Sequence, residues 1–347
     1  MRIGFVVNDV ATEKAGYTTI RLARKAANRG HPVCLIGLAD FCYRSDGTVH
    51  ARAWAPRSPD HDQDGEFLSE LQDERSEPVE IALGELDVLM LRSNPSDETA
   101  RPWAPTSGLL FAQLAADQGV MVLNDPTHLT DASNKTYFQR FPERVRPVTC
   151  ITRDPDEIRR FIEKRDGCGV IKPLQGSGGQ GVFVVRSDDH SNLAQMIDAV
   201  TRDGYAIVQE YLPRAAEGDI RLFTLNGRAL QVEGKYACVQ RVSTNGDARS
   251  NITAGGEARK AQPDADALTL AEVVGPKLVL DGMYMAGLDI VGDKMMEINV
   301  DTPGGLGSAE ALLGVDFCGY VISDLERKLR LRDDYGGSLD NTALATL

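Results

Sequence analysis

The sequence predicts an α/β protein in which a small doubly wound domain precedes a larger α+β part. Residues 2–7 and 31–38 are apolar runs typical of buried strands, and a helical pattern lies between them at 18–29. Such a β-α-β opening is typical of a doubly wound sheet, which binds ligands at the carboxyl ends of its strands. Beyond residue 123, short hairpins are mixed with helices, and this pattern indicates an α+β arrangement.

The first domain continues with a small hairpin and two further strands. The hairpin spans 41–53 and turns at an Asp-Gly dipeptide, which favours tight turns. Apolar strands are predicted at 86–91 and 120–123, with a helix at 107–118 between them. We therefore predict that residues 1–123 form one doubly wound domain.

A second domain is predicted over residues 124–330, because Asn124-Asp125-Pro126 interrupts the first pattern. Its predicted helices lie at 130–138, 154–164, 191–202 and 264–281. Its predicted strands lie at 148–152, 170–173, 182–185, 206–212, 221–225, 228–232, 288–291 and 295–300. Residues 331–347 are polar, and we predict a loose tail there.

Composition limits the classes of function. The chain has 347 residues, 42% hydrophobic and 26% charged, which suffices for a full core and about two domains. Its net charge of −13 argues against a nucleic-acid partner, because phosphate binding needs clustered Lys and Arg. No apolar run is long enough to span a membrane, and the N-terminus lacks the features of a signal peptide. The six cysteines show no metal-ligand spacing and are typical of reduced thiols, so we expect a cytoplasmic protein.

A glycine-rich loop at 176–181 has the pattern G-x-G-x-x-G. A Rossmann fingerprint requires a helix after the glycines, whereas an apolar strand follows here. A strand, glycine loop and strand are similar to the flap that protein kinases place over ATP phosphates, although no HRD or DFG element is present. Lys172 ends the preceding strand, from which it could reach a phosphate. The alternative interpretation is a plain glycine-rich turn.

Three oxygen-bearing side chains are predicted to share one face of the last hairpin. If its loop has three residues, Val291 faces Met295 and Asp289 faces Glu297 directly. Asn299 then lies two residues further along the same face. Carboxylate and amide oxygens suit a hard cation such as Mg²⁺. The alternative is an exposed strand face with scattered polar residues.

Three arginines fall within one segment of the second domain, and an asparagine lies close to the last of them. These residues are Arg221, Arg241, Arg249 and Asn251. Several arginines in an otherwise acidic chain indicate anion binding. Arginines paired with surface acids are the alternative explanation. Lys135 is a weaker candidate by itself, because lysines on helices are mostly exposed.

Several stretches of the sequence follow one another in a distinctive order. They are RSNP, NDPTHLTDASNKTYF, VIKPLQGSGGQGVFVV, QEYLP, GDIRLFTLNG, RSNITAGGEAR and GLDIVGDKMMEINV. This order resembles the ATP-grasp ligases and, within them, the bacterial glutathione synthetase family. The resemblance runs from the first strand to about residue 328. It implies a doubly wound pre-ATP-grasp domain and then an ATP-grasp domain, with a nucleotide lobe at about 124–205 and a catalytic lobe at about 206–330.

The same resemblance implies how the nucleotide and the metal are held. Lys135 and Lys172 would bind ATP phosphates, with Asp219 near the nucleotide. The loop that closes over the phosphates would comprise Gly176, Ser177, Gly178, Gly179, Gln180 and Gly181. The hinge that holds adenine would comprise Glu210, Tyr211 and Leu212. The Mg²⁺ ligands would be Asp289, Glu297 and Asn299, in agreement with the hairpin argument.

The substrate residues also follow from the resemblance. The acyl phosphate and the substrate carboxylates would face Arg221, Arg241, Arg249 and Asn251. The acceptor side would be formed by Asn8 and Arg92 of the first domain and by the segment that includes Thr302, Gly304 and Gly305. The implied reaction joins a carboxylate to an amine, with ATP converted to ADP and phosphate. Two Mg²⁺ ions, or Mn²⁺, small-molecule substrates and a dimer or tetramer are expected on the same basis.

The segment after Val300 departs from the family pattern. Glutathione synthetases typically continue with Ser/Thr-Pro-Thr-Gly-Ile, whereas this chain has Asp301-Thr302-Pro303-Gly304-Gly305. An acidic residue and extra glycines would change how an anionic peptide docks. Two other functions therefore remain open: a ligase of the same mechanism that joins a different amino acid, peptide or protein tail, and a nucleotide-binding regulator without catalysis.

Overall fold

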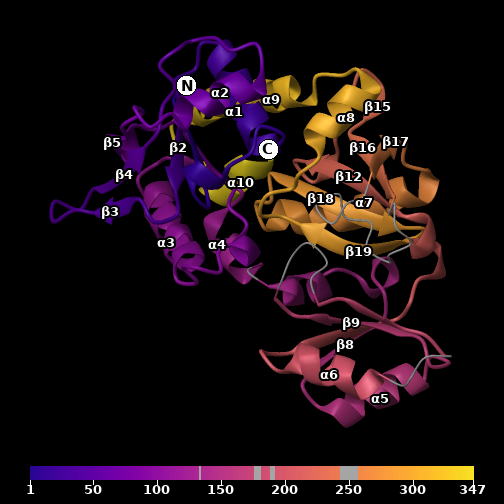
Figure 1. Cartoon of the computed structure of the whole chain (residues 1–347). Helices are drawn as coiled ribbons and strands as arrows, with labels where there is room; N and C mark the ends of the chain where they lie inside the picture. Colours follow the sequence, from indigo (N-terminus) through magenta and orange to yellow (C-terminus); the bar gives the residue numbers. More distant parts are fainter. Residues whose placement is uncertain (133, 176–180, 188–191, 243–256) are drawn as a thin grey trace.

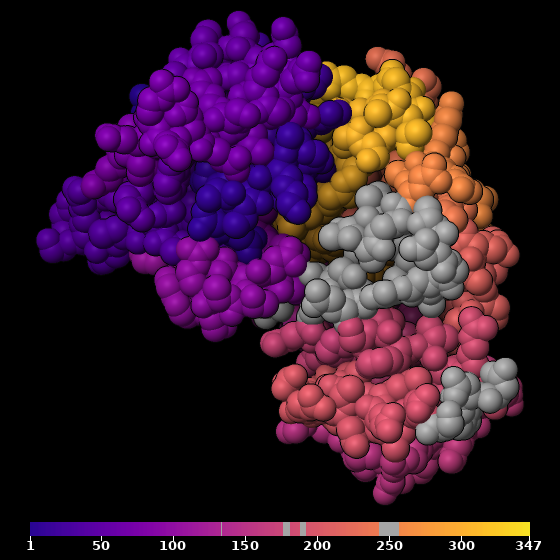
Figure 2. All heavy atoms as spheres, viewed as in Figure 1, coloured from indigo at the N-terminus to yellow at the C-terminus, as the bar shows by residue number. Residues whose placement is uncertain are grey.

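The computed structural model describes residues 1–132, 134–175, 181–187, 192–242 and 257–347. Over these residues the chain forms a main body and a smaller projecting lobe (Figures 1 and 2). The main body contains the N-terminal domain and a large antiparallel sheet, while the lobe contains a second antiparallel sheet. The α/β prediction, with a doubly wound domain first and an α+β part after it, is therefore confirmed.

The N-terminal domain is built on a parallel sheet with the strand order β2-β1-β6-β7. Its strands are β1 (Ile3–Val7), β2 (Val33–Gly37), β6 (Val88–Leu91) and β7 (Met121–Leu123). All their residues are buried, as expected for a sheet that is covered on both faces. Helix α1 (Thr18–Asn28) packs on one face and α3 (Ala104–Asp117) on the other. Both helices and all four strands were predicted.

A small antiparallel sheet extends the N-terminal domain to one side (Figure 1). Its strands are β3 (Phe41–Tyr43), β4 (Val49–Ala53) and β5 (Val79–Ala82), and the sequence predicted the β3–β4 hairpin. The helix α2 (Asp64–Leu71) follows β4. Short 3₁₀ turns lie at Val10–Thr12, Leu83–Glu85 and Pro95–Asp97.

The projecting lobe contains an antiparallel sheet with the order β10-β9-β11-β8. Its strands are β8 (Thr149–Thr152), β9 (Gly169–Pro173), β10 (Phe183–Val185) and β11 (Ala206–Gln209). Helices α5 (Pro155–Glu163) and α6 (Leu193–Thr201) cover one face of this sheet and share a separate hydrophobic core with it. The other face is turned toward the main body (Figure 1).

The large sheet of the main body has the order β17-β16-β12-β18-β19, with β13 paired to β12. Its strands are β12 (Asp219–Leu225), β13 (Arg228–Ala229), β16 (Cys238–Val242), β17 (Glu257–Lys260), β18 (Met285–Val291) and β19 (Lys294–Asn299). A small pair, β14 (Gln231–Val232) and β15 (Lys235–Tyr236), lies beside it. Helix α7 (Ala265–Leu280) packs on one face of the sheet, while α8 (Leu306–Leu313) and α9 (Phe317–Asp334) connect the sheet to the N-terminal domain. Further 3₁₀ turns lie at Glu143–Val145 and Pro213–Glu217.

Two predicted elements are wrong. The helix expected at 130–138 is replaced by α4 (Pro126–Asp131) and a 3₁₀ turn η4 (Lys135–Arg140). Asp125 is the N-cap of α4, since its carboxylate accepts hydrogen bonds from the backbone N–H groups of Thr127 and His128 at 3.1 and 3.2 Å. The helix therefore starts directly after the interrupting Asn-Asp-Pro, with Pro126 at its first position.

The polar tail predicted at 331–347 is also wrong. Helix α9 continues to Asp334, and α10 (Asn341–Thr346) follows, with Leu344 and Ala345 buried. The side chain of Asn341 bonds the backbone N–H and C=O of Val122 at 2.8 and 3.0 Å, so it caps the edge of the parallel sheet. Lys328, fully buried on α9, donates to the carbonyl of Leu344 at 3.2 Å.

No single helix among the described residues is long and apolar enough to cross a membrane. Helices α8 and α9 would reach that length only as a pair bent by 120°.

Candidate nucleotide and metal site

The last hairpin pairs Asp289 with Glu297, as predicted, but through a different turn. Val291 faces Lys294 rather than Met295, so the loop has two residues, and a β-bulge follows between Asp289 and Ile290. The extra residue in β19 restores the predicted register. It also has a packing role, because residues 295 and 297 would share a face in a regular strand. The bulge instead places Met295 in the core and Glu297 on the opposite face, beside Asp289.

Neighbouring strands contribute charged side chains to the same face as Asp289. Arg221 of β12 holds Asp289 with two parallel hydrogen bonds, Nε to Oδ1 at 2.6 Å and Nη2 to Oδ2 at 2.8 Å. Arg241 of β16 lies 2.7 Å from Asp289 Oδ2, and its Nε donates to Asp219 at 3.0 Å. This face of the sheet thus carries alternating acidic and basic groups from three adjacent strands.

Burial and pairing shift the ionisation of this group. Burial alone would raise the pKa of Asp289, but the charges of Arg221 and Arg241 hold it below its usual value. Burial lowers the pKa of Arg241, and the charges of Asp289 and Asp219 outweigh it and raise the pKa above that of a free guanidinium. Asp289 and Arg241 are therefore both charged at neutral pH.

Two lysines approach from the side of the projecting lobe. Lys135 Nζ lies 3.5 Å from Glu297 Oε1. Lys172, on β9, has its pKa lowered to about 8 by burial and by the positive charge of Lys135, against the opposing effect of Glu297 and Asp289. A polyanion placed between the two lysines would relieve their mutual repulsion and favour the charged form of Lys172.

The predicted hinge lies where β11 leaves the lobe. Glu210 follows β11 directly, and its carboxylate accepts a hydrogen bond from the backbone N–H of Val148 at 3.0 Å. Tyr211 and Leu212 lead from there into the 3₁₀ turn η6 (Pro213–Glu217). These residues form a connection between the lobe and the large sheet, as a hinge requires.

The predicted acceptor residues meet at the junction of the two domains. The side chain of Asn8 donates to the carbonyl of Asn94 at 2.9 Å and accepts from its N–H at 2.6 Å. Arg92 is buried and donates to the carbonyl of Pro303 at 3.0 Å. Arg221 donates to the carbonyl of Gly304 at 3.2 Å. The backbone of the 301–305 segment is thereby held between one arginine from each domain.

The other members of this segment have local roles. Thr302 donates its backbone N–H to the side-chain oxygen of Asn299 at 3.1 Å, which orients that amide. Gly305 is the N-cap residue of α8 and has φ of 100°, a backbone conformation that favours glycine. Seven predicted residues lie outside the described residues: Gly176, Ser177, Gly178, Gly179, Gln180, Arg249 and Asn251. Gly181 is described and has φ of 68°.

Two carboxyl groups lie near Arg92, those of Asp301 and Glu13, and sequence reasoning missed Glu13. Burial raises the pKa of Glu13 to about 7 and that of Asp301 to about 7, in both cases against the lowering effect of Arg92. Burial likewise lowers the pKa of Arg92 to about 10. Glu13 Oε2 is buried and has no hydrogen-bond partner among the described residues. Nothing in the local sequence around Glu13 distinguishes it from an exposed acid, so only its tertiary position reveals it.

We expect the substitution Glu13→Gln to stabilise the protein at high pH. The folded-state pKa lies above the ordinary value of about 4.5, so the folded protein binds more protons than the unfolded chain between these pH values. Stability should then fall as pH rises from about 4.5 to 7, and the variant should lack this loss. At pH 8.5 we expect a gain of about 3 kcal/mol, and at pH 4.5 almost none. Urea unfolding of both proteins at the two pH values measures the difference.

The matched control is Glu77→Gln, which removes an exposed carboxylate. It should change the unfolding free energy by less than about 0.5 kcal/mol at either pH. An equal effect of Glu13→Gln at both pH values would contradict the assignment of a buried, proton-binding Glu13.

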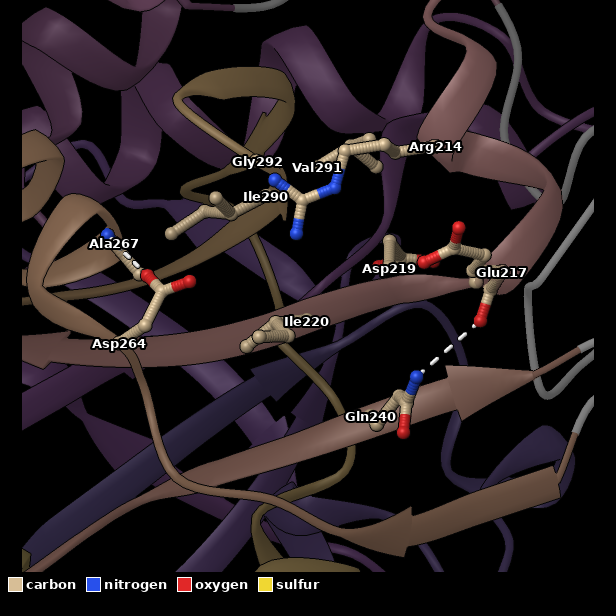
Figure 3. A pocket seen from close by; sticks show the side chains of 11 residues that line it. Arg214, Glu217, Asp219, Ile220, Gln240, Asp264, Ala267, Ile290, Val291 and Gly292 are labelled. Carbon is tan, nitrogen blue, oxygen red and sulfur yellow. Dashed lines mark hydrogen bonds between the residues drawn. The ribbon is translucent and has the colours of Figure 1, made fainter.

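A pocket lies between the large sheet and the start of α7 (Figure 3). Its lining includes Ile220 and Ile290, which alternate along their strands with Arg221 and Asp289 and therefore point to the other side. Arg214 lies at its edge, against Gly292 of the hairpin turn (Figure 3). Asp219, a predicted nucleotide residue, also lines this pocket, whereas Arg221 and the three predicted metal ligands do not.

The residues of the site face suit a hard divalent cation. Asp289 and Glu297 are directly paired across adjacent strands, and Asn299 follows on the same face opposite Gly287. Their side chains offer carboxylate and amide oxygens, the donors that Mg²⁺ prefers. The pKa of Asp289 is lowered, so its oxygens are deprotonated as a metal ligand requires.

The family is decided by sequence. Residues 1–130 match the model described as "Prokaryotic glutathione synthetase, N-terminal domain", and residues 134–313 match "Prokaryotic glutathione synthetase, ATP-grasp domain". The chain belongs to the prokaryotic glutathione synthetase family. A glutathione synthetase of Shewanella oneidensis is 34% identical over 259 residues, which are 74% of this chain and 78% of that relative. A glutathione synthetase of Salmonella typhimurium is 29% identical over 333 residues, which are 95% of this chain and 99% of that relative.

Solved structures support the same fold. The D-cycloserine synthetase DcsG has a TM-score of 0.61 at 13% identity, with 93% of this chain and 99% of that chain covered. The ATP-grasp ligase PsnB, in a complex with a precursor variant, Mg and ADP, has a TM-score of 0.59 at 16% identity, with 94% and 98% covered. As a member of the glutathione synthetase family, the chain is an ATP-dependent ligase that acts on small molecules with a divalent metal.

Proposed function

We propose that this enzyme makes glutathione by joining γ-glutamylcysteine to glycine. The proposal is supported by the relatives, which are named glutathione synthetases and which this chain matches over most of their length. The observation that carries it is the single sheet face that gathers metal-ligating oxygens, two arginines and the loop held against Arg92. This face comprises Asp289, Glu297, Asn299, Arg221 and Arg241.

The reaction has two steps. The carboxylate of γ-glutamylcysteine attacks the γ-phosphorus of ATP, the bond to the leaving ADP oxygen breaks, and an acyl phosphate forms. The amine of glycine then attacks the carbonyl carbon, and phosphate leaves as the amide bond forms. No nucleophilic side chain is needed, so the protein acts by positioning and by electrostatic stabilisation.

The residues of the site face supply these effects. Lys135 and Lys172 hold the phosphates as point charges, and the charge of Lys172 increases when an anion binds beside it. Arg221 and Arg241 face the transferring phosphoryl group and the developing oxyanion, where fixed cations stabilise the transition state. Asp289, Glu297 and Asn299 would hold Mg²⁺, which neutralises phosphate oxygens when it is bound.

Other parts of the proposal rest on the family alone. We infer two Mg²⁺ ions, for which Mn²⁺ could substitute, a homo-oligomer that is a dimer or a tetramer, and a cytoplasmic location. We also assign residues 1–123 to the pre-ATP-grasp domain and 124–330 to the ATP-grasp domain, with the hinge at Glu210, Tyr211 and Leu212.

The test is ADP release by the purified protein with Mg²⁺-ATP, γ-glutamylcysteine and glycine. In two further reactions, γ-glutamylcysteine or glycine is omitted. We expect release to require both substrates and a tripeptide to be identified by mass spectrometry. ADP release that is independent of glycine would contradict the proposal.

The second candidate function is a ligation with a different carboxylate or amine. It is favoured by Asp301, which places an additional acid where the relatives' pattern has Ser or Thr, close to Arg92. An acid at this position weakens the attraction of Arg92 for an anionic peptide. A panel of carboxylates and amines in the same ADP assay distinguishes the two candidates, and turnover with another pair alone would favour the second.

A further inference from the structure

Asp289 is unusual among the three expected metal ligands because arginines already engage both of its oxygens. Arg221 donates hydrogen bonds from Nε to Oδ1 at 2.6 Å and from Nη2 to Oδ2 at 2.8 Å. This two-bond geometry is typical of a strong arginine–carboxylate pair. Arg241 forms an ion pair with the same carboxylate, with its Nη2 2.7 Å from Oδ2. Glu297 differs, since its ion pair is with Lys135 at 3.5 Å and its side chain is 46% exposed.

The two arginines differ in how firmly they are held elsewhere. Arg241 also pairs with the buried carboxylate of Asp219, so it would keep a partner if it lost Asp289. Arg221 has one further described hydrogen bond, from Nη1 to the backbone carbonyl of Gly304 at 3.2 Å. That carbonyl is neutral and belongs to the segment that holds the acceptor in the proposed function. Arg221 is therefore the arginine that a change at Asp289 affects most.

A cation bound by Asp289 meets the guanidinium of Arg221 at the same two oxygens. Two positive groups a few ångströms apart repel each other, and the repulsion is strong at a buried site. We propose that Arg221 and the divalent metal exchange on Asp289, so that metal binding transfers Arg221 from the carboxylate to the acceptor side of the site. The inference rests on the metal assignment of the proposed function.

The exchange gives Arg221 two roles at one position. When it is paired with Asp289, it shares with Arg241 the neutralisation of a buried carboxylate. When it is released, its Nη1 contact with Gly304 keeps the guanidinium at the loop that lies against Arg92. Metal loading and the presentation of a cation to the substrate carboxylate are thereby coupled, and such coupling acts equally in both directions.

The test is direct binding of Mn²⁺, measured by electron paramagnetic resonance without nucleotide or substrate. In the full-length protein, Arg221→Gln removes the competing cation, and we expect it to lower the Kd for Mn²⁺ about tenfold. Arg221→Lys keeps the charge but cannot form the paired hydrogen bonds, so we expect an intermediate Kd. Unchanged or weaker Mn²⁺ binding by folded Arg221→Gln, verified by circular dichroism, would overturn the exchange.

Two further variants separate this inference from the proposed function. Arg214→Gln removes the same charge at the edge of the pocket beside α7 (Figure 3), and it should leave the Kd for Mn²⁺ within about twofold of wild type. The double variant Arg221→Gln, Asp289→Asn should lose the tenfold gain, because the shared carboxylate is absent. If it retains the gain, the exchange on Asp289 is wrong, whereas the ADP assay tests the ligase activity separately.

Discussion

Glu297→Gln is expected to lower kcat roughly a thousandfold or more, about 4 kcal/mol in transition-state stabilisation, with little effect on folding. Glutamine has nearly the same shape but lacks the negative charge that a divalent cation requires. The fold should persist because the side chain is half exposed and its ion pair with Lys135, at 3.5 Å, is long. Exposed pairs of this kind contribute less than about 1 kcal/mol.

Initial rates of ADP release and a thermal melt of the same sample measure the two effects. Asp293→Asn is the matched control, since it removes a carboxylate from the turn of the same hairpin, where the side chain is 74% exposed. It should keep near-normal turnover. If Glu297→Gln were as active as this control, the metal assignment would be wrong.

Asn124→Ala is expected to lower the free energy of unfolding by about 3 kcal/mol. Asn124 is buried where the chain passes from the parallel sheet to the second domain. Its amide nitrogen donates to the carbonyls of Met285 and Val300 at 3.0 and 2.5 Å, and its oxygen accepts from the N–H of Met285 at 2.9 Å. Alanine would leave these buried backbone groups without their partners, and each such loss is unfavourable.

Urea denaturation monitored by circular dichroism measures this effect. Asn192→Ala is the control, because Asn192 is exposed and its side chain makes no capping hydrogen bond at the start of α6. We expect a change within about 0.5 kcal/mol for the control. An equally small change for Asn124→Ala would show that water or a local shift replaces the three hydrogen bonds.

The predicted metal face illustrates how far local sequence can lead. The assumption of a three-residue loop paired Asp289 with Glu297 correctly, although that loop length is wrong. The actual loop has two residues, and a bulge compensates for the difference. A bulge of this kind depends on whether Met295 fits into the core beneath the sheet. Strand periodicity alone cannot predict that fit.

For the C-terminal segment, the prediction from local sequence is wrong. Residues 331–347 are polar enough to indicate a tail, yet α10 is a helix whose few apolar side chains are buried. Its position depends on Asn341, which bonds Val122 from 219 residues away along the chain. Short helices gain most of their stability from tertiary packing, so composition underestimates them.

The sequence by itself determined the α/β class, most helices and strands and the family, and it supplied the candidate residues of the site, because these depend on local periodicity and on motif order. Only the tertiary structure decided the partners of the charged groups. Arg221 and Asp289 lie 68 residues apart, and their pairing arises from the register of β12 against β18. The buried environments of Glu13 and Lys172 likewise depend on which distant segments exclude water, and burial is what shifts their pKa values.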